Sequence, residues 1–184
     1  MKTMILAALF ASTSAFAAIQ KIQPTGGGVE FLAIGKPQFI KIHGKGTPSK
    51  GTISLDGEKI SGNLEFDVAS LDTEIAKRNE HMKEKYLEVG KYPKATLDLK
   101  SAKPLKGWSL AKPELKDADL EGELTLHGTK KPVQGKFSIT DKSAATVTFK
   151  VKLSDYKIEI PSYLGVTVAE DVEVTVKIDK LGAI

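Results

Sequence analysis

Apolar and polar residues alternate along most of this chain, most clearly over residues 60–68, 120–126, 133–139, 147–153 and 172–178. In a β-strand, successive side chains point to opposite faces, so each stretch would place its apolar side chains on one face. This period of two is typical of half-buried antiparallel strands. The sequence therefore predicts an all-β protein.

Four weaker strands fit residues 29–34, 39–43, 51–55 and 95–100, and Asp56-Gly57 forms a turn signal after the third of them. With the five clear stretches, the total comes to about eight or nine strands, which is the size of a small closed barrel. No repeat or linker-like segment divides the chain. We therefore expect one domain.

Residues 73–87 break the alternation. They have high helix propensity, Asp72 or Thr73 can cap their start, and Gly90 and Pro93 prevent continuation of a helix. This segment is the one convincing helix that the sequence predicts.

One face of this predicted helix is apolar. Ile75, Met82 and Tyr86 are spaced by seven and four residues and therefore lie on one side. Arg78 or Asn79 fills the gap one turn along, so a polar group would point toward the sheet.

A single helix of about four turns cannot cover a whole sheet, so the apolar faces of the strands must cover one another. Two stacked sheets or one curled sheet would achieve this, and only the curled sheet removes exposed edges. We predict an antiparallel β-barrel of about eight strands with one lid helix, whose interior is either filled or holds one ligand. The predicted lumen residues are Leu64, Phe66, Met82, Leu97, Leu99, Leu124, Leu126, Phe137, Phe149, Val151, Val174 and Val176.

The first 17 residues resemble a secretory signal peptide. Lys2 precedes an apolar run over residues 4–11, and the small-residue site Ala15-Phe16-Ala17 follows. This run is too short to serve as a membrane-spanning anchor. We expect cleavage near Ala17, a mature domain over residues 18–184, and a periplasmic or secreted location.

The composition and motifs of the chain argue against several functions. Without Lys2, 26 basic and 23 acidic residues leave a net charge of +3 with both signs dispersed, which does not favour nucleic-acid binding. The chain has no cysteine and no recognisable catalytic motif, so an enzyme is not expected. His43, His81 and His127 lack the spacing of metal ligands, so no metal or cofactor is expected. The sequence leaves open whether the protein forms a homodimer.

Three ordered motifs resemble the signatures of the YceI-like family and together cover most of the mature chain. The first comprises DVASLDT at 67–73, RNEHM at 78–82, YL at 86–87 and KYPKATL at 91–97; the second is GELTLHGTKKPV at 122–133; the third comprises DYKI at 155–158, PSYLGV at 161–166 and DVEV at 171–174.

This resemblance implies an extended, lipocalin-like barrel in the periplasm or outside the cell that binds a long amphiphilic isoprenoid, such as a polyprenyl phosphate or a quinone, without a reaction. The candidates for head-group contacts at the mouth are Arg78, Asn79 and His81: an arginine suits a phosphate and an asparagine suits a quinone carbonyl. Glu74 and Asn79 replace the glycine and aspartate that are common in the family.

Three alternatives stay open at this point. Arg78 could pair with Asp72 or Glu74 and only fix the helix. The strand pattern equally fits a β-sandwich that binds another protein through its surface and has no cavity. A hydrolase or isomerase that acts on a lipid is a third reading, although no nucleophile and base stand out.

The start of the chain gives the first prediction. The protein is expected to be exported and to begin at Ala18, which N-terminal sequencing of material from the cell envelope will test. A cytoplasmic protein that retains Met1 would contradict it.

Overall fold

The computed structural model describes most of residues 19–183. The predicted signal peptide lies outside the described residues, and so does Phe39, the first residue of one predicted strand. The structure describes residues 19–36, 40–103, 105–106, 108–109, 111–140, 142–163 and 165–183.

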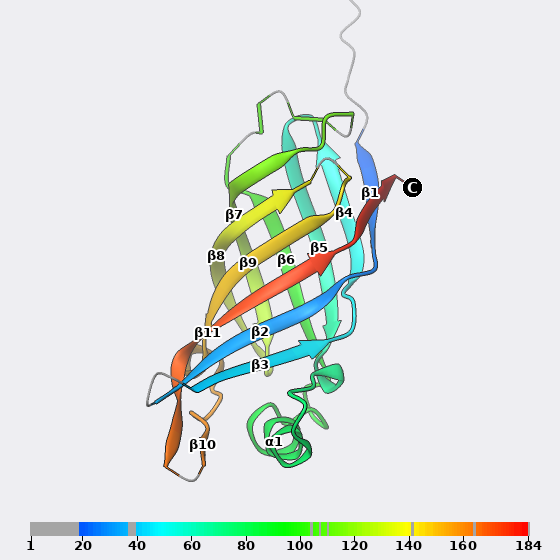
Figure 1. The fold of residues 1–184 in the computed structure, drawn as a ribbon. Coiled ribbons are helices and arrows are strands. Elements are labelled where there is room, and N and C mark those ends of the chain that lie inside the picture. The colour runs from blue at the N-terminus through cyan, green and yellow to red at the C-terminus, as the bar shows by residue number, and fades with distance from the viewer. Residues whose placement is uncertain are drawn as a thin grey trace, which may run out of the picture.

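The described strands form a single antiparallel sheet that curls around an apolar interior (Figure 1). Its hydrogen-bonded order is β12-β1-β4-β5-β6-β7-β8-β9-β11-β2-β3, and β10 pairs with β11. The strands are β1 (Gln20–Thr25), β2 (Gly28–Lys36), β3 (Ile40–Gly46), β4 (Lys50–Asp56), β5 (Lys59–Asp67), β6 (Lys94–Ser101), β7 (Leu115–Leu126), β8 (Thr129–Ile139), β9 (Ala145–Lys152), β10 (Ser162–Tyr163), β11 (Val166–Ile178) and β12 (Lys180–Ala183).

Bent strands let the sheet close on itself at one end. β1 and β2 are one long strand that bends at Gly26 and Gly27, where Gly27 has φ +83° and a Cβ atom would lie 2.0 Å from the carbonyl oxygen of Lys177. After the bend, β2 pairs with β3 and β11, whereas β1 pairs with β4 and β12. β4 pairs with β1 on one side and with β5 on the other, so the hydrogen bonding between strands continues around this end of the barrel.

The twelve strands exceed the predicted eight or nine, because several of them are segments of longer, bent strands. β1 continues into β2, β3 into β4 and β11 into β12, so twelve strands less these three continuations and the two-residue β10 leave eight. The sheet is a single curled layer, which excludes the two stacked sheets of a sandwich for the described strands.

At the other end the sheet is a half-barrel, because β3 and β5 do not pair directly. One bridge spans this seam: Lys45 and Asp72 exchange two backbone hydrogen bonds of 2.9 and 2.7 Å. The amide of Thr47 also donates to the hydroxyl of Ser70, at 3.1 Å. The short helical turn Val68–Ser70 after β5 therefore covers the edge of β3.

The helix is shorter than predicted. The α-helix α1 spans Ala76–His81 and continues as the π-helical turn η2, Met82–Tyr86, below the half-barrel (Figure 1). The predicted start at Thr73 was wrong, because Glu74 has φ +66°, which a right-handed helix cannot accommodate. No described helix is long and apolar enough to cross a membrane.

Three strands were not predicted because they are short and carry little alternation: β1, β10 and β12. β7 also begins five residues before the predicted stretch at Leu120. An irregularity between Leu115 and Ala118, where Asp117 has φ +50°, interrupts the alternation there.

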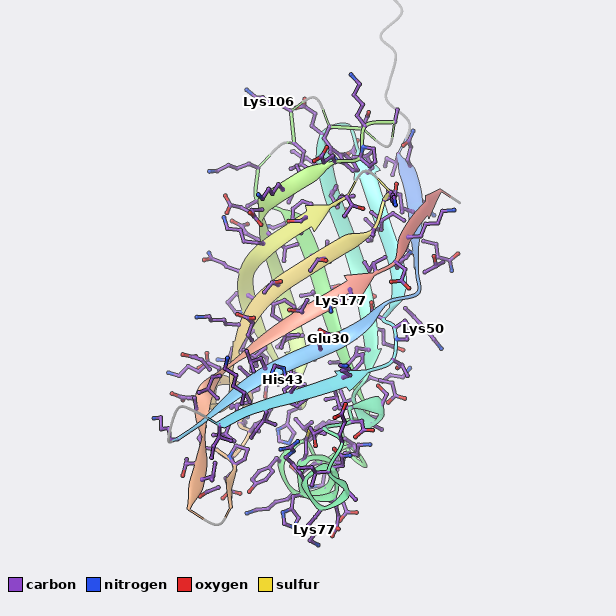
Figure 2. The ribbon with its side chains drawn as sticks, in the orientation of Figure 1. Glu30, His43, Lys50, Lys77, Lys106 and Lys177 are labelled. Carbon is purple, nitrogen blue, oxygen red and sulfur yellow. The ribbon has the colours of Figure 1, made fainter. Side chains whose placement is uncertain are left out.

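The predicted division into inner and outer faces holds along the sheet. Leu120, Ile178 and Ile139 are 2–3% exposed and pack inside. Charged side chains cover the outer face (Figure 2), where Lys177 of β11 and Glu30 of β2 form an ion pair of 2.8 Å. Such exposed pairs contribute little stability, so the fold depends on its interior.

Leu124 and Thr125 test this register. Leu124 is 6% exposed on the inner face, so Leu124→Asp should lower the free energy of unfolding in urea by about 3 kcal/mol or more, because it buries an unpaired charge. Thr125→Asp faces Lys130 of the neighbouring strand on the outside, and its effect should stay within about 0.5 kcal/mol. Equal losses in both variants would refute the register.

Candidate functional site

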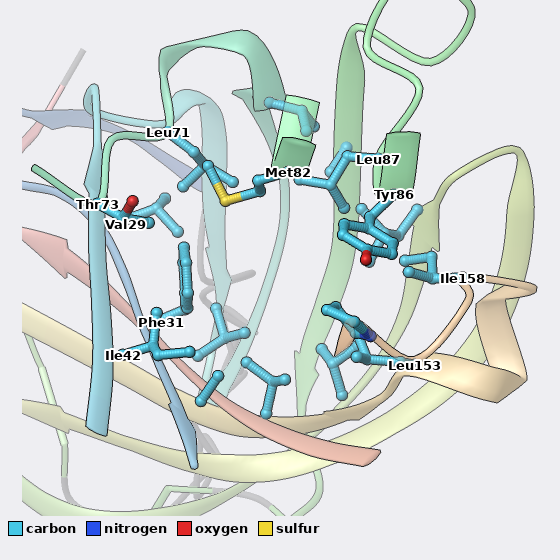
Figure 3. Close-up of a pocket in the computed structure, with 18 of the residues that line it drawn as sticks. Val29, Phe31, Ile42, Leu71, Thr73, Met82, Tyr86, Leu87, Leu153 and Ile158 are labelled. Atoms are coloured by element: carbon cyan, nitrogen blue, oxygen red, sulfur yellow. The ribbon is translucent and has the colours of Figure 1, made fainter. Parts of the chain in front are cut away.

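The interior of the half-barrel contains a cavity of about 560 Å³ (Figure 3). Its walls are the inner faces of β2, β3, β5, β6, β7, β9 and β11, and the helical segment lies across its opening. Phe31, Met82, Leu153 and Ile158 show the character of the lining, which is almost entirely aliphatic and aromatic. A cavity of this kind suits a ligand with a large apolar part.

Most of the predicted lumen residues meet at this cavity. Leu99 and Phe137 were also predicted to contact the ligand, but they do not line the cavity. Both point inward and lie in the closed end of the barrel. Alternation identifies the face of a strand and not the height along the barrel, so the sequence could not separate these two. The residues that line the cavity as predicted are Leu64, Phe66, Met82, Leu97, Leu124, Leu126, Phe149, Val151, Val174 and Val176.

Sequence reasoning missed part of the wall. Val29 and Phe31 of β2 line the cavity, but Leu32 and Ile34 are apolar on the other face, which hides the period of two in this strand. Leu153 and Ile158 come from a short helical turn and the segment after it, where no strand pattern exists.

The opening of the cavity carries basic residues. Lys77, Arg78 and His81 of α1 line it, Lys77 and Arg78 are cationic, and no aspartate or glutamate is among the described lining residues. Two of the three predicted head-group residues are therefore at the mouth. Asn79, the third, does not line the cavity, because its side chain is turned toward the segment before the helix.

A compact group of hydrogen bonds fixes the start of the helix, and Thr73, 3% exposed, is its centre. The amide and hydroxyl of Thr73 donate to Oδ1 of Asn79 at 2.8 and 2.7 Å. Arg78 donates through Nε to the Thr73 hydroxyl at 2.9 Å and through a terminal nitrogen to the Thr73 carbonyl at 2.6 Å. Arg78 thus bonds to Thr73, and not to Asp72 or Glu74 as the alternative reading had it.

Asp72 completes this group. Its carboxylate accepts hydrogen bonds from the amide of Glu74 at 2.7 Å and from the side chain of Asn79 at 2.6 Å. These two bonds hold the pKa of Asp72 below its usual value. Both bonds go to Oδ1, and no ion pair between Asp72 and Arg78 occurs among the described contacts.

The far end of the helical segment is also fixed. Nε2 of His127 lies 2.9 Å from a carboxylate oxygen of Glu88, and Nδ1 lies 3.1 Å from the carbonyl oxygen of Tyr156. The ring of Tyr92 packs against His127 with 4.5 Å between the centroids and a tilt of 59° between the ring planes. His127 therefore ties the β7–β8 turn to the chain that follows the helix. No group of three metal-ligating side chains occurs among the described residues.

One hydroxyl in the cavity wall has no partner. Ser49, between β3 and β4, is 7% exposed, and its Oγ forms no hydrogen bond. A buried polar group without a partner is costly, so this hydroxyl gains from any ligand atom that can donate or accept a hydrogen bond. Among the described residues of the wall, Ser49 alone has a buried side-chain polar atom without a hydrogen bond.

A curled antiparallel sheet around an apolar cavity, with one short helix at the mouth, defines a lipocalin-like protein. The family model of the YceI-like domain matches residues 21–179. The chain therefore belongs to the YceI-like family, as its three motifs predicted.

Sequence relatives support this assignment. Protein YceI of Salmonella newport is 31% identical over 165 residues, which are 82% of this chain and 81% of that protein. A UPF0312 protein of Pseudomonas savastanoi pv. phaseolicola is 38% identical over 96 residues, half of this chain. That match spans 46% of the relative, so the aligned part is about half the length of that protein.

Two solved structures share the fold at 18% identity. The polyisoprenoid binding domain from Saccharophagus degradans implicated in plant cell wall breakdown aligns with a TM-score of 0.59 over 90% of this chain and 98% of that domain. Burkholderia cenocepacia BcnA aligns with a TM-score of 0.62 over 82% of this chain and 94% of its own. At this identity the likeness concerns the fold.

Thr73 gives a test of how the helix is held. Thr73→Val keeps the shape of the side chain but removes the hydroxyl that bonds Asn79 and Arg78, so the free energy of unfolding should fall by about 1–3 kcal/mol. Amide exchange over residues 76–86 should rise. Thr52→Val on the exposed face of β4 is the matched control and should change stability by less than about 0.5 kcal/mol; an equally small effect at Thr73 would refute the role of this group.

Proposed function

We propose that this protein is an exported, non-enzymatic binding protein that encloses the hydrocarbon chain of an isoprenoid-type lipid. The observation that carries the proposal is the apolar cavity of about 560 Å³ with a cationic mouth. The membership in the YceI-like family and the fold shared with a polyisoprenoid binding domain support the ligand class.

Burial of the chain would supply most of the affinity. Each methylene group that leaves water contributes about 0.8 kcal/mol, so a chain that fills the cavity outweighs the cost of ordering the ligand. The apolar wall cannot distinguish one hydrocarbon from another by hydrogen bonding. Selection among head groups therefore depends on the mouth.

Arg78 is the strongest candidate for contact with an anionic head group. A guanidinium has five N–H donors, and the described hydrogen bonds to Thr73 use two of them. Arg78 is thus held in place and still has donors for a phosphate, which it can bind in a forked geometry. This favours a polyprenyl phosphate over a neutral quinone.

The catalytic reading has less support. Lys77, Arg78, His81 and Tyr86 are the titratable groups of the described lining, and all belong to the helical segment at the mouth. The deep wall offers only apolar side chains and a few hydroxyls, such as that of Ser49. A nucleophile with its base is not assembled there, and we propose binding without turnover.

Extraction of the purified protein with organic solvent, followed by mass spectrometry, is the direct test. Protein prepared from the cell envelope without detergent should release a prenyl lipid in an amount close to one molecule per chain. Leu124→Asp, which places a charge in the wall, should release none. A wild-type protein that neither releases nor takes up any prenyl lipid would overturn the proposal.

The charge of Arg78 predicts a difference between ligands. Arg78→Ala should weaken a prenyl phosphate by about 1.5–3 kcal/mol more than a quinone with the same chain, since only the phosphate loses a charged hydrogen bond. Lys85→Ala removes a positive charge from the same helical segment but outside the described cavity lining, so it should change the affinity for both ligands little. Equal losses for both ligands in Arg78→Ala, measured by titration calorimetry, would reduce Arg78 to a structural role.

A further inference from the structure

The interior of the barrel is divided into two compartments. The open cavity occupies the half near the helix, and the closed end beyond it holds a void of only about 30 Å³. The closed end is therefore an almost completely filled core, and among the described residues Leu64 alone borders both compartments.

The boundary runs between consecutive inward positions of the strands. On β6, Leu97 lines the cavity and Leu99 lines the closed end; on β9, Phe149 and Val147 are divided in the same way. Phe137 of β8 pairs with Val147 and stands on the closed side. Leu64, Leu99 and Phe137 therefore form the floor of the cavity.

This floor is firmly packed. Leu64, Leu99 and Phe137 are 3%, 7% and 5% exposed, and behind them Leu120 and Ile178 are each 2% exposed. Interiors at this density do not yield to an additional group without strain in neighbouring side chains. A ligand chain that reaches the floor cannot continue into the closed end.

We propose that the floor sets the length of chain that the protein can enclose, an inference that rests on the proposed function. The distance from the mouth to this floor, and not the total length of the ligand, then fixes how much of the chain is buried. A chain that already reaches the floor cannot enclose further units while its phosphate stays at Arg78. Additional units therefore add no affinity.

The affinity of the wild-type protein for chains of increasing length tests this. Prenyl monophosphates of two, three, four, six and eight units are titrated by calorimetry below their aggregation concentrations. Affinity should rise by roughly fourfold for each enclosed methylene group and stop rising once the chain reaches the floor. A continued rise through six and eight units would overturn the proposal, whereas no binding of any chain would overturn the proposed function itself.

Variants of the floor provide the second test. Phe137→Ala opens the closed end, so the length at which affinity stops rising should increase, whereas Phe137→Leu keeps most of the floor and should leave it unchanged. Leu99→Ala removes the floor side chain of β6 and is measured if Phe137→Ala does not fold. Circular dichroism reports whether each variant folds. An unchanged limiting length in every folded alanine variant would show that the floor does not set it.

Discussion

The structure depends on one constraint: its strands have apolar faces, and no layer of helices exists to cover them. The sheet must therefore cover itself, and it does so by curling until β4 meets β1. Such closure requires sharp bends, which explains the two successive glycines at 26 and 27. A Cβ atom would collide with the side chain of Asp179 at Gly26 and with the carbonyl of Lys177 at Gly27. At the closed end the inward side chains pack into a filled core. Toward the helix, the inward side chains line the cavity.

Hydrogen bonds at both ends hold the helical segment at the remaining opening of the barrel. Thr73 uses its amide, carbonyl and hydroxyl to hold Asn79 and Arg78, and His127 holds the other end through Glu88. Two departures from the family pattern fall in this group. Glu74, where a glycine is common, has a left-handed backbone, and Asn79, where an aspartate is common, donates to Asp72 as well as accepting from Thr73.

The sequence predicted the architecture far better than the mouth. The period of two placed Leu124 inside and Thr125 outside, and the lack of a second helix forced the curled sheet, because both follow from local geometry. The height of Leu99 and Phe137 along the barrel depends on the tilt and bending of the whole sheet, which no local pattern contains. The start of the helix and the orientation of the Asn79 side chain depend on hydrogen bonds around Thr73 between residues several positions apart. Helix propensity, which is a local property, favoured a helix from Thr73 onward.

The seam between β3 and β5 has a dynamic consequence. β2 holds one edge of β3 along a seven-residue register, whereas the bridge between Lys45 and Asp72 holds the other with two backbone hydrogen bonds. Thr47 adds one hydrogen bond to Ser70 across the same seam. Local opening begins where the fewest hydrogen bonds must break, so the amides of Lys45 and Asp72 are expected to exchange with solvent before those of the closed end.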